Sequence, residues 1–76
     1  MTIRVKFFAK LREDLGKEEV EVAAHEPMRI SEVWTQATGR ALPAEIFCSI
    51  NHEHAQPDQL ANDRDEVAFF PRITGG

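Results

Sequence analysis

Hydrophobic and polar residues alternate in the first stretch of the chain, residues 2–8 (TIRVKFF). Ile3, Val5 and Phe7 share one face of this stretch, and Phe8 falls on the other face. A period of two is typical of a half-buried β-strand. The same alternation predicts further strands at 18–23, 46–50 and 66–70, with a short edge strand at 54–56.

The alternation also assigns the faces of the later strands. The positions expected to face the core are Val20, Val22, Ile46, Cys48, Ile50, Val67 and Phe69. Ala68 and Phe70 then point to the opposite face, because successive side chains of a strand alternate. A tight turn at 62–65 leads into the last strand, and we expect Leu60 to fill the core from the loop before it.

One stretch has the period of an α-helix. Its apolar residues recur at i, i+3, i+4 and i+7 and form one stripe: Ile30, Val33, Trp34 and Ala37. This helix is expected to begin at Arg29 or Ser31 and to end at Gly39. A shorter helical turn is predicted at 9–16, with Gly16 as its end.

The elements follow the order strand, strand, helix, strand, short strand, strand. This order predicts an α+β roll, with a mixed sheet of four to five strands and one main helix on one face. In such a roll the first and last strands commonly pair in parallel at the centre of the sheet through a right-handed crossover. The other face of the sheet stays open, and we expect Phe8 and Phe70 to lie on it together.

Composition and charge narrow the class of protein. A chain of 76 residues is long enough for one small domain. Its formal net charge of -4 disfavours a nucleic-acid partner and suits docking on basic protein surfaces. Cys48 is the single cysteine, which excludes an internal disulfide and suits a reducing compartment. With no signal peptide and no run of roughly 20 apolar residues, we expect a cytoplasmic protein without a membrane partner.

The chain finishes on FFPRITGG, with Gly75 and Gly76 in the last positions. A diglycine there has two interpretations. It can be a loosely ordered end, as chain termini often are. It can also carry a terminal carboxylate that reacts, because glycines lack Cβ and thread narrow channels that other residues cannot enter.

The segments VKFFAKLRE, DRDEV, VAFFP and TGG resemble the small subunit of molybdopterin synthase, the MoaD family. The resemblance covers the full length in order and spacing, and its most specific part is DEVAFFP followed by the terminal Gly76. It implies the ubiquitin-like β-grasp fold for residues 1–71, with 72–76 as a flexible C-terminal tail. Two positions depart from the family pattern: Arg72 replaces a second proline, and Arg64 replaces the glycine of a turn. A non-glycine at positive φ in that turn would carry a modest cost.

The resemblance also implies a function, that of a sulfur carrier in molybdenum-cofactor synthesis which is not an enzyme by itself. A MoeB-like enzyme would use ATP to adenylate Gly76, and a sulfur donor protein would convert the glycyl adenylate into a thiocarboxylate (1-thioglycine). The tail would then enter the large synthase subunit, MoaE, in a heterotetramer and give its sulfur to a cyclic pterin precursor. The carrier itself would bind no cofactor. The tail residues that precede Gly76 are Arg72, Ile73, Thr74 and Gly75.

The outward phenylalanines, Phe8 and Phe70, are the expected centre of the contact with a partner. Two aromatic side chains side by side on an open sheet face are typical of a docking surface. Arg12 is expected as a polar contact at its rim. Pro71 is expected to stiffen the exit of the tail, because its ring fixes φ.

The other notable residues favour structural roles. Cys48, on an inward face, is expected to be a small buried hydrophobe, and Trp34 belongs to the core stripe of the helix. His52 and His54 are too few for a closed metal site, so no metal is expected. The charged residues of 63–66 are expected to form a solvated turn.

Three other functions stay open at this point. A sulfur carrier of the ThiS type, which serves thiazole formation, also ends in diglycine. A ubiquitin-like modifier that is conjugated to lysines would use the same activation chemistry. A plain interaction module would carry the diglycine incidentally, and removal of Gly76 would then have no effect.

Overall fold

The computed structural model describes residues 1–71. The strands are β1 (Thr2–Phe7), β2 (Glu19–Ala23), β3 (Met28–Arg29), β4 (Phe47–Ile50), β5 (Glu53–Ala55), β6 (Leu60–Ala61) and β7 (Glu66–Phe70). The helices are α1 (Ala9–Leu15) and α2 (Ile30–Thr38). The elements predicted from periodicity are confirmed to within one residue at each end, and the short strands β3 and β6 are additional.

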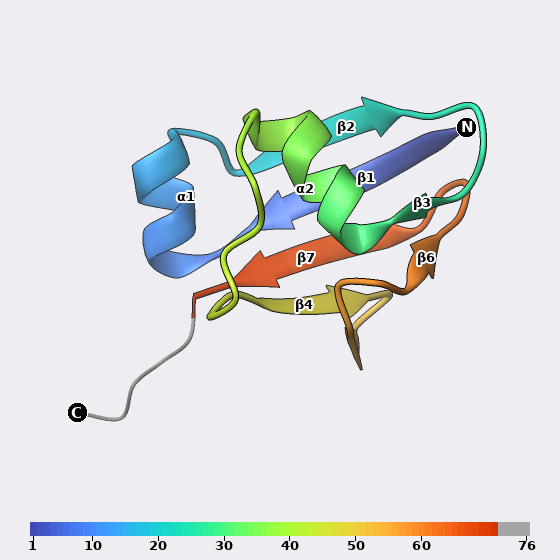
Figure 1. Ribbon diagram of the computed structural model, residues 1–76. Coiled ribbons are helices and arrows are strands. Elements are labelled where there is room, and N and C mark those ends of the chain that lie inside the picture. The colour runs from blue at the N-terminus through green and yellow to red at the C-terminus, as the bar shows by residue number, and fades with distance from the viewer. Residues whose placement is uncertain (72–76) are drawn as a thin grey trace.

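The main sheet is mixed and, within the described residues, has five strands in the order β2-β1-β7-β4-β5. As predicted, β1 and β7 pair in parallel at its centre, and the other neighbours are antiparallel. In this register Val5 lies beside Val67, and Phe7 lies beside Phe69. The inward residues of β1 and β7 therefore form two adjacent rows beneath α2. Figure 1 shows the two strands side by side, with α2 in front of the sheet.

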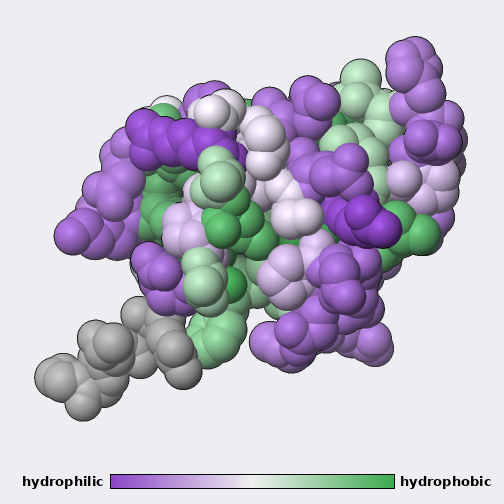
Figure 2. Space-filling view, viewed as in Figure 1, coloured by the Kyte–Doolittle hydropathy of each residue, from purple (hydrophilic) through white to green (hydrophobic). Residues whose placement is uncertain are grey.

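The helix α2 lies across one face of the sheet and closes the core (Figure 1). Trp34 is its largest inward side chain, and its ring makes edge contacts with Phe69 (centroids 4.9 Å apart) and Phe7 (5.9 Å). The indole Nε1–H donates to the carbonyl oxygen of Ala41 (3.2 Å), so the polar atom of this buried residue is satisfied. Viewed from the helix side, hydrophobic surface shows between hydrophilic ends of the molecule (Figure 2).

The start of α2 and the ends of both helices carry residues suited to those positions. At the start of α2, the Glu32 carboxylate accepts a hydrogen bond from the Arg29 backbone N–H (3.3 Å), and its negative charge complements the helix dipole. Gly39 ends α2 with φ 75°, and Gly16 ends α1 with φ 66°. These left-handed conformations cost glycine little, which explains why both helices stop where the sequence predicts. In the part of the chain that the structure describes, neither helix is long and apolar enough to cross a membrane.

Two expectations about the loop before β7 are wrong. Leu60 does not fill the core, because it is 56% exposed in β6, where it pairs with Arg29 of β3. Its neighbour Ala61 is fully buried instead, since the pleat of a strand turns successive side chains to opposite sides. Glu66 does not belong to a solvated turn, because it opens β7 and its side chain is only 12% exposed.

The turn before β7 has the geometry that its sequence suggested. Arg64 adopts φ 69°, the left-handed conformation that a glycine would take at lower cost. Its backbone N–H donates to the carbonyl oxygen of Thr2 (2.7 Å), and the Asp65 carboxylate accepts from the Asn62 backbone N–H (2.7 Å). These bonds hold the turn in place and offset the strain at Arg64.

Candidate functional site

The open face of the sheet, which α2 does not cover, carries an aromatic region where β7 ends. We call the side chains of Phe8, Phe47 and Phe70 the aromatic patch. The rings of Phe8 and Phe70 stack with centroids 4.9 Å apart and planes 12° from parallel. Phe8 follows the end of β1, and its backbone N–H continues the ladder by donating to the Phe69 carbonyl oxygen (3.2 Å). The prediction that Phe8 and Phe70 lie together is confirmed, and Phe8 is 39% exposed.

Phe47 completes the aromatic patch and is missing from the predicted contact residues. It lies on β4 directly beside Phe70 of β7 and is 44% exposed. Its ring makes an edge contact with the His54 imidazole of β5, with centroids 6.1 Å apart. The signal for Phe47 was present in the sequence, because the alternation that sends Cys48 inward also sends Phe47 outward.

The tail leaves the domain beside this patch. Pro71, half-buried, is the residue after β7 and the last one that the structure describes. Its place next to Phe70 agrees with the expected exit from the sheet. The predicted tail residues Arg72, Ile73, Thr74, Gly75 and Gly76 lie outside the described residues.

Arg12, the residue predicted to make a polar contact with a partner, lies on α1 at the border of the aromatic patch. Its guanidinium Nη1 is 3.8 Å from Oε1 of Glu18, and its side chain is 51% exposed. Arg12 and Phe8 line the same hollow, of about 490 Å³, together with Lys6 and Glu19. The guanidinium can therefore reach a partner that covers Phe8, and it carries little cost of desolvation while it stays at the rim.

A second region of the open face is charged and extends from the start of β7 along β1 to Lys6, which borders the hollow beside Phe8. We call Arg4, Lys6, His52 and Glu66 the charged cluster. The Glu66 carboxylate lies 3.2 Å from Arg4 Nη2, 3.5 Å from Lys6 Nζ and 3.6 Å from His52 Nε2. Since its side chain is only 12% exposed, Glu66 needs the cations of Arg4 and Lys6 to compensate its partial loss of hydration.

Comparison with known proteins identifies the family of this chain. The ThiS family model matches residues 5–76, which is nearly the whole chain. The chain belongs to the ThiS family. A curated relative of this ThiS-family chain is the molybdopterin synthase sulfur carrier subunit of Escherichia coli (strain K12), 38% identical over 80 residues. That match covers 97% of this chain and 99% of the relative, which confirms the resemblance found in the sequence.

Solved structures with the same fold support the predicted ubiquitin-like β-grasp architecture. SAMP1 from Haloferax volcanii superposes with a TM-score of 0.85 at 24% identity, over 100% of both chains. A putative molybdopterin converting factor, subunit 1, from Pyrococcus furiosus gives a TM-score of 0.78 at 21% identity, over 96% of this chain and 99% of the other. Because these sequence identities are only 24% and 21%, the two superpositions are evidence for a shared fold alone.

The nucleophilic and metal-binding side chains of the described residues do not form a reaction centre. Cys48 is 2% exposed, and burial raises the pKa of its thiol to about 11, so it stays protonated at neutral pH. His52 sits in the β4–β5 turn with φ 72°, so His52 and His54 do not lie on an extended strand together. Among residues 1–71, no three His, Cys, Asp or Glu side chains are grouped as metal ligands.

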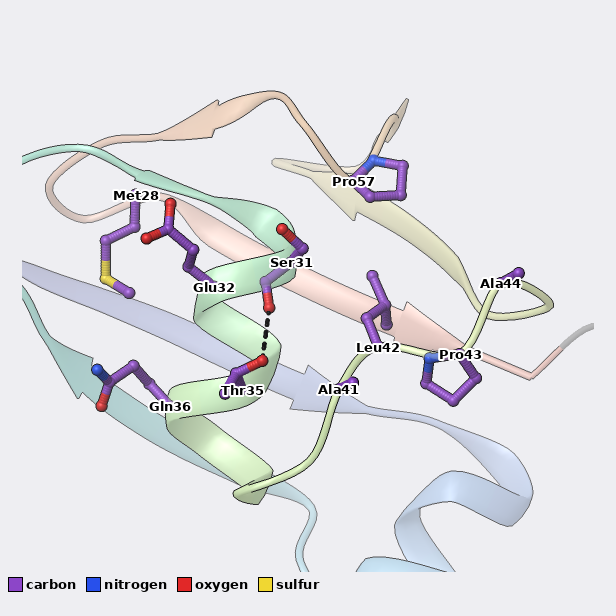
Figure 3. Close-up of a pocket in the computed structure, with 10 residues that line it drawn as sticks. All are labelled: Met28, Ser31, Glu32, Thr35, Gln36, Ala41, Leu42, Pro43, Ala44 and Pro57. Carbon is purple, nitrogen blue, oxygen red and sulfur yellow. Dashed lines mark hydrogen bonds between the residues drawn. The ribbon is translucent and has the colours of Figure 1, made fainter.

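A groove on the helix side of this ThiS-family chain lies beside α2 and has a volume of about 430 Å³. Figure 3 shows it between α2 and the 41–44 segment, with Pro57 on the far side. The only ionisable side chain of its lining is Glu32, which is engaged with the Arg29 N–H. The Thr35 hydroxyl donates to the Ser31 carbonyl oxygen (3.1 Å) rather than into the groove. The groove therefore lacks a paired acid and base.

Proposed function

We propose that this chain is the sulfur carrier subunit of a molybdopterin synthase. The observation that carries the proposal is the 38% identity, over nearly the full length, to a relative with that name. The family match extends to residue 76, so the proposal includes the terminal glycines. The carrier supplies a carboxyl group and no catalysis of its own.

The chemistry starts at the Gly76 carboxylate. A carboxylate with a pKa near about 3.5 is ionised at neutral pH and is a poor acyl donor. An adenylating enzyme of the MoeB type therefore transfers AMP from ATP to one carboxylate oxygen, and pyrophosphate leaves. The outer sulfur of a persulfide on a donor protein then attacks the acyl carbon and displaces AMP, and a second thiol of the donor cleaves the S–S bond, which forms a disulfide on the donor and leaves a thiocarboxylate on Gly76. The thiocarboxylate gives its sulfur to the cyclic pterin precursor.

The aromatic patch supplies the docking surface for the large, MoaE-like subunit in this proposal. Phe8, Phe47 and Phe70 present apolar surface at the point where the chain leaves the sheet. Five residues beyond Pro71 can span up to about 17 Å when extended, which is enough to reach from a docking surface into a partner's pocket. Arg12 contributes a polar contact at the rim, and two carriers with two large subunits would form the heterotetramer.

A cytoplasmic location fits the proposal, since the activation step consumes ATP and the chain keeps a free thiol at Cys48.

The direct test is the intact mass of the protein isolated from its own cells. We expect a fraction with one oxygen replaced by sulfur, and fragmentation should confine the change to Gly76. Sulfur found instead as a persulfide on Cys48 would contradict the proposal.

Variants of the tail separate the chemistry from the fold. Gly75→Val should leave the melting temperature unchanged, because the core cluster is built from residues between Ile3 and Phe69. It should block sulfur transfer, because a β-branched side chain restricts the backbone. One residue added after Gly76 should be equally damaging, since a misplacement of about 1 Å can lower a rate on the order of a hundredfold. The measurements are ATP–pyrophosphate exchange and molybdopterin formation. Equal activity of wild type and both variants would show that the diglycine has no role.

The thiocarboxylated protein isolated from its own cells also distinguishes the alternative functions. The thiocarboxylated chain is supplied in parallel to a molybdopterin-forming and a thiazole-forming system, and we expect sulfur transfer in the first only. Stable conjugates to lysines of unrelated proteins would instead favour a modifier. The structural likeness to SAMP1 does not argue for that role, because it concerns the fold alone.

A further inference from the structure

One edge of the main sheet is long, unpaired and unused by the proposed function. Among residues 1–71, the strand β2 has β1 on one side and no strand on the other. Figure 1 shows it at the upper edge of the sheet, with α2 in front of it. A strand edge with free backbone groups is a template for an additional strand from another chain.

The hydrogen-bond pattern identifies which backbone groups of β2 are free. The Phe7 N–H donates to the Glu18 carbonyl oxygen, and the Ala24 N–H donates to the Met1 carbonyl oxygen. In an antiparallel ladder the bonded residues alternate, so the even-numbered residues of β2 face β1. The N–H and C=O groups of Glu19, Glu21 and Ala23 therefore point away from the sheet. Within residues 1–71 none of these groups has a hydrogen-bond partner.

The opposite edge of the main sheet, formed by β5, has fewer backbone groups available to an added strand. There β5 contains three residues and is joined to β4 by a two-residue turn, with Ile50 paired to Glu53. The flanking residues of such a turn bond to each other, so only His54 of β5 directs its backbone outward. Beyond β5, the Gln56 N–H is already taken by its own loop, because it donates to Oε1 of Gln59. Among the described residues, β2 is therefore the edge able to add a strand over its whole length.

The side chains beside the β2 edge differ on the two faces. On the helix side, a groove of about 350 Å³ runs between β2 and the last turn of α2. Val20, Val22 and Ala37 form its apolar lining and Lys17 and Gln36 its polar lining, and the Lys17 Nζ is engaged there because it donates to the Ala37 carbonyl oxygen (3.2 Å). On the open side, Glu19 and Glu21 are exposed, and Glu21 makes no ion pair among the described residues. An added strand would thus present apolar side chains to the groove and cationic side chains to the two carboxylates.

We propose that the β2 edge binds an extended segment of a partner protein in which apolar residues alternate with lysine or arginine. A second copy of this chain fits poorly, because antiparallel pairing of two β2 strands centred on Glu21 places Glu21 opposite its own equivalent. Two strands, β1 and β7, separate this edge from β4, so a partner bound there leaves Phe47 uncovered, while Glu19 at one end of the edge borders the hollow that also holds Phe8. The β2 edge would be a second docking surface, independent of the proposed sulfur chemistry.

The test uses the full chain and a synthetic peptide, acetyl-Lys-Val-Lys-Val-Lys-Val-amide, followed by amide hydrogen exchange in NMR. We expect the peptide to slow exchange at the N–H groups of Glu19, Glu21 and Ala23. A peptide with glutamate in place of lysine, and one N-methylated on alternate amides, should each bind at least about tenfold more weakly, a difference of about 1.4 kcal/mol.

Two variants of the protein complete the test. Glu21→Lys should weaken binding of the lysine peptide about tenfold or more and strengthen binding of the glutamate peptide. Glu21→Pro removes one outward N–H without removing a bond to β1, so it should also weaken binding, whereas His54→Pro at the other edge should not. Protection of the Val20 and Val22 amides shows in each case that the β1–β2 ladder is intact.

Three results would overturn the proposal: no change in exchange at saturating peptide, equal binding of the N-methylated peptide, or protection confined to β5. Each would mean that Glu19 and Glu21 only guard the edge against aggregation.

Discussion

Two Phe-Phe pairs in this chain behave in opposite ways, although each occurs at the end of a central strand. Phe7 and Phe69 are 1% and 0% exposed, stack on each other at 6.0 Å and lie under Trp34. Phe8 and Phe70, the next residues along the chain, stack at 4.9 Å on the open face. A step of one residue therefore separates an aromatic pair inside the core from an aromatic pair on the surface.

The difference shows that the two faces of one sheet have separate roles: the covered face stabilises the fold, and the open face is available to a partner. The inner pair is enclosed by α2 and contributes to the free energy of unfolding. The outer pair remains partly hydrated, so its burial is still available to a partner. Mutations in the two pairs should accordingly change different measured quantities, and the predictions below test that division.

The largest effect is expected from Phe69→Ala, which empties the space between Phe7 and Trp34. Truncation of a buried phenylalanine costs about 3–5 kcal/mol of unfolding free energy, a large share of the total for so small a domain. Chemical denaturation monitored by Trp34 fluorescence provides the measurement. A loss below about 1 kcal/mol would mean that the inner pair is not the centre of the core. Phe69→Leu is the matched control and should retain most of the stability.

A smaller effect, on a different quantity, is expected from Phe70→Ala. Loss of an aromatic residue at the centre of an interface costs about 2 kcal/mol, or roughly thirtyfold in the dissociation constant. We expect this loss in binding to the proposed large subunit by calorimetry, with a change of about 1 kcal/mol or less in unfolding free energy. An unchanged dissociation constant for Phe70→Ala would remove the aromatic patch from the proposed interface. Phe47→Ala tests whether the patch extends onto β4.

The charged cluster allows a test of whether polar side chains on the open face add stability, because it lies on the same face as the aromatic patch. Glu66→Gln keeps the shape of the side chain and removes its attraction to the cations of Arg4 and Lys6. We expect a loss of about 0.5–1 kcal/mol in unfolding free energy at low salt, and less at about 1 M salt, where charges are screened. Glu21→Gln is the control, because Glu21 has no ion pair among residues 1–71. Equal effects of the two substitutions would show that the cluster adds no stability.

The smallest effect at neutral pH is expected at Cys48, on the inner side of the sheet. Burial raises the pKa of its thiol from 9.0 to about 11, so the unfolded chain loses this proton at lower pH than the folded chain. Stability from this group is therefore complete below pH 9.0 and falls as the pH rises toward about 11. We expect the wild type to lose more stability than Cys48→Ala over this interval, measured by urea denaturation. Parallel curves would place the thiol in contact with water.

The sequence was sufficient for much of the fold because the information is local. The period of two fixed the inward faces of β1 and β7, and the helical stripe fixed the inward face of α2. Glycines at positions 16 and 39 marked the helix ends, since a left-handed residue stops a helix within one turn. The same alternation separated Phe7 from Phe8 and Phe69 from Phe70, so the contrast between core and surface was determined by the sequence alone.

Only the tertiary structure decided how distant segments meet. Leu60 and Ala61 could not be assigned to their faces, because β6 is two residues long and its orientation depends on pairing with β3. Phe47 joins the aromatic patch because β4 lies beside β7 in one particular register. The side chains around Glu66 come from β1 and the β4–β5 turn. The free edge of β2 exists because no second strand of residues 1–71 pairs with it. Strand neighbours and register arise from packing across the whole chain, which a local period does not specify.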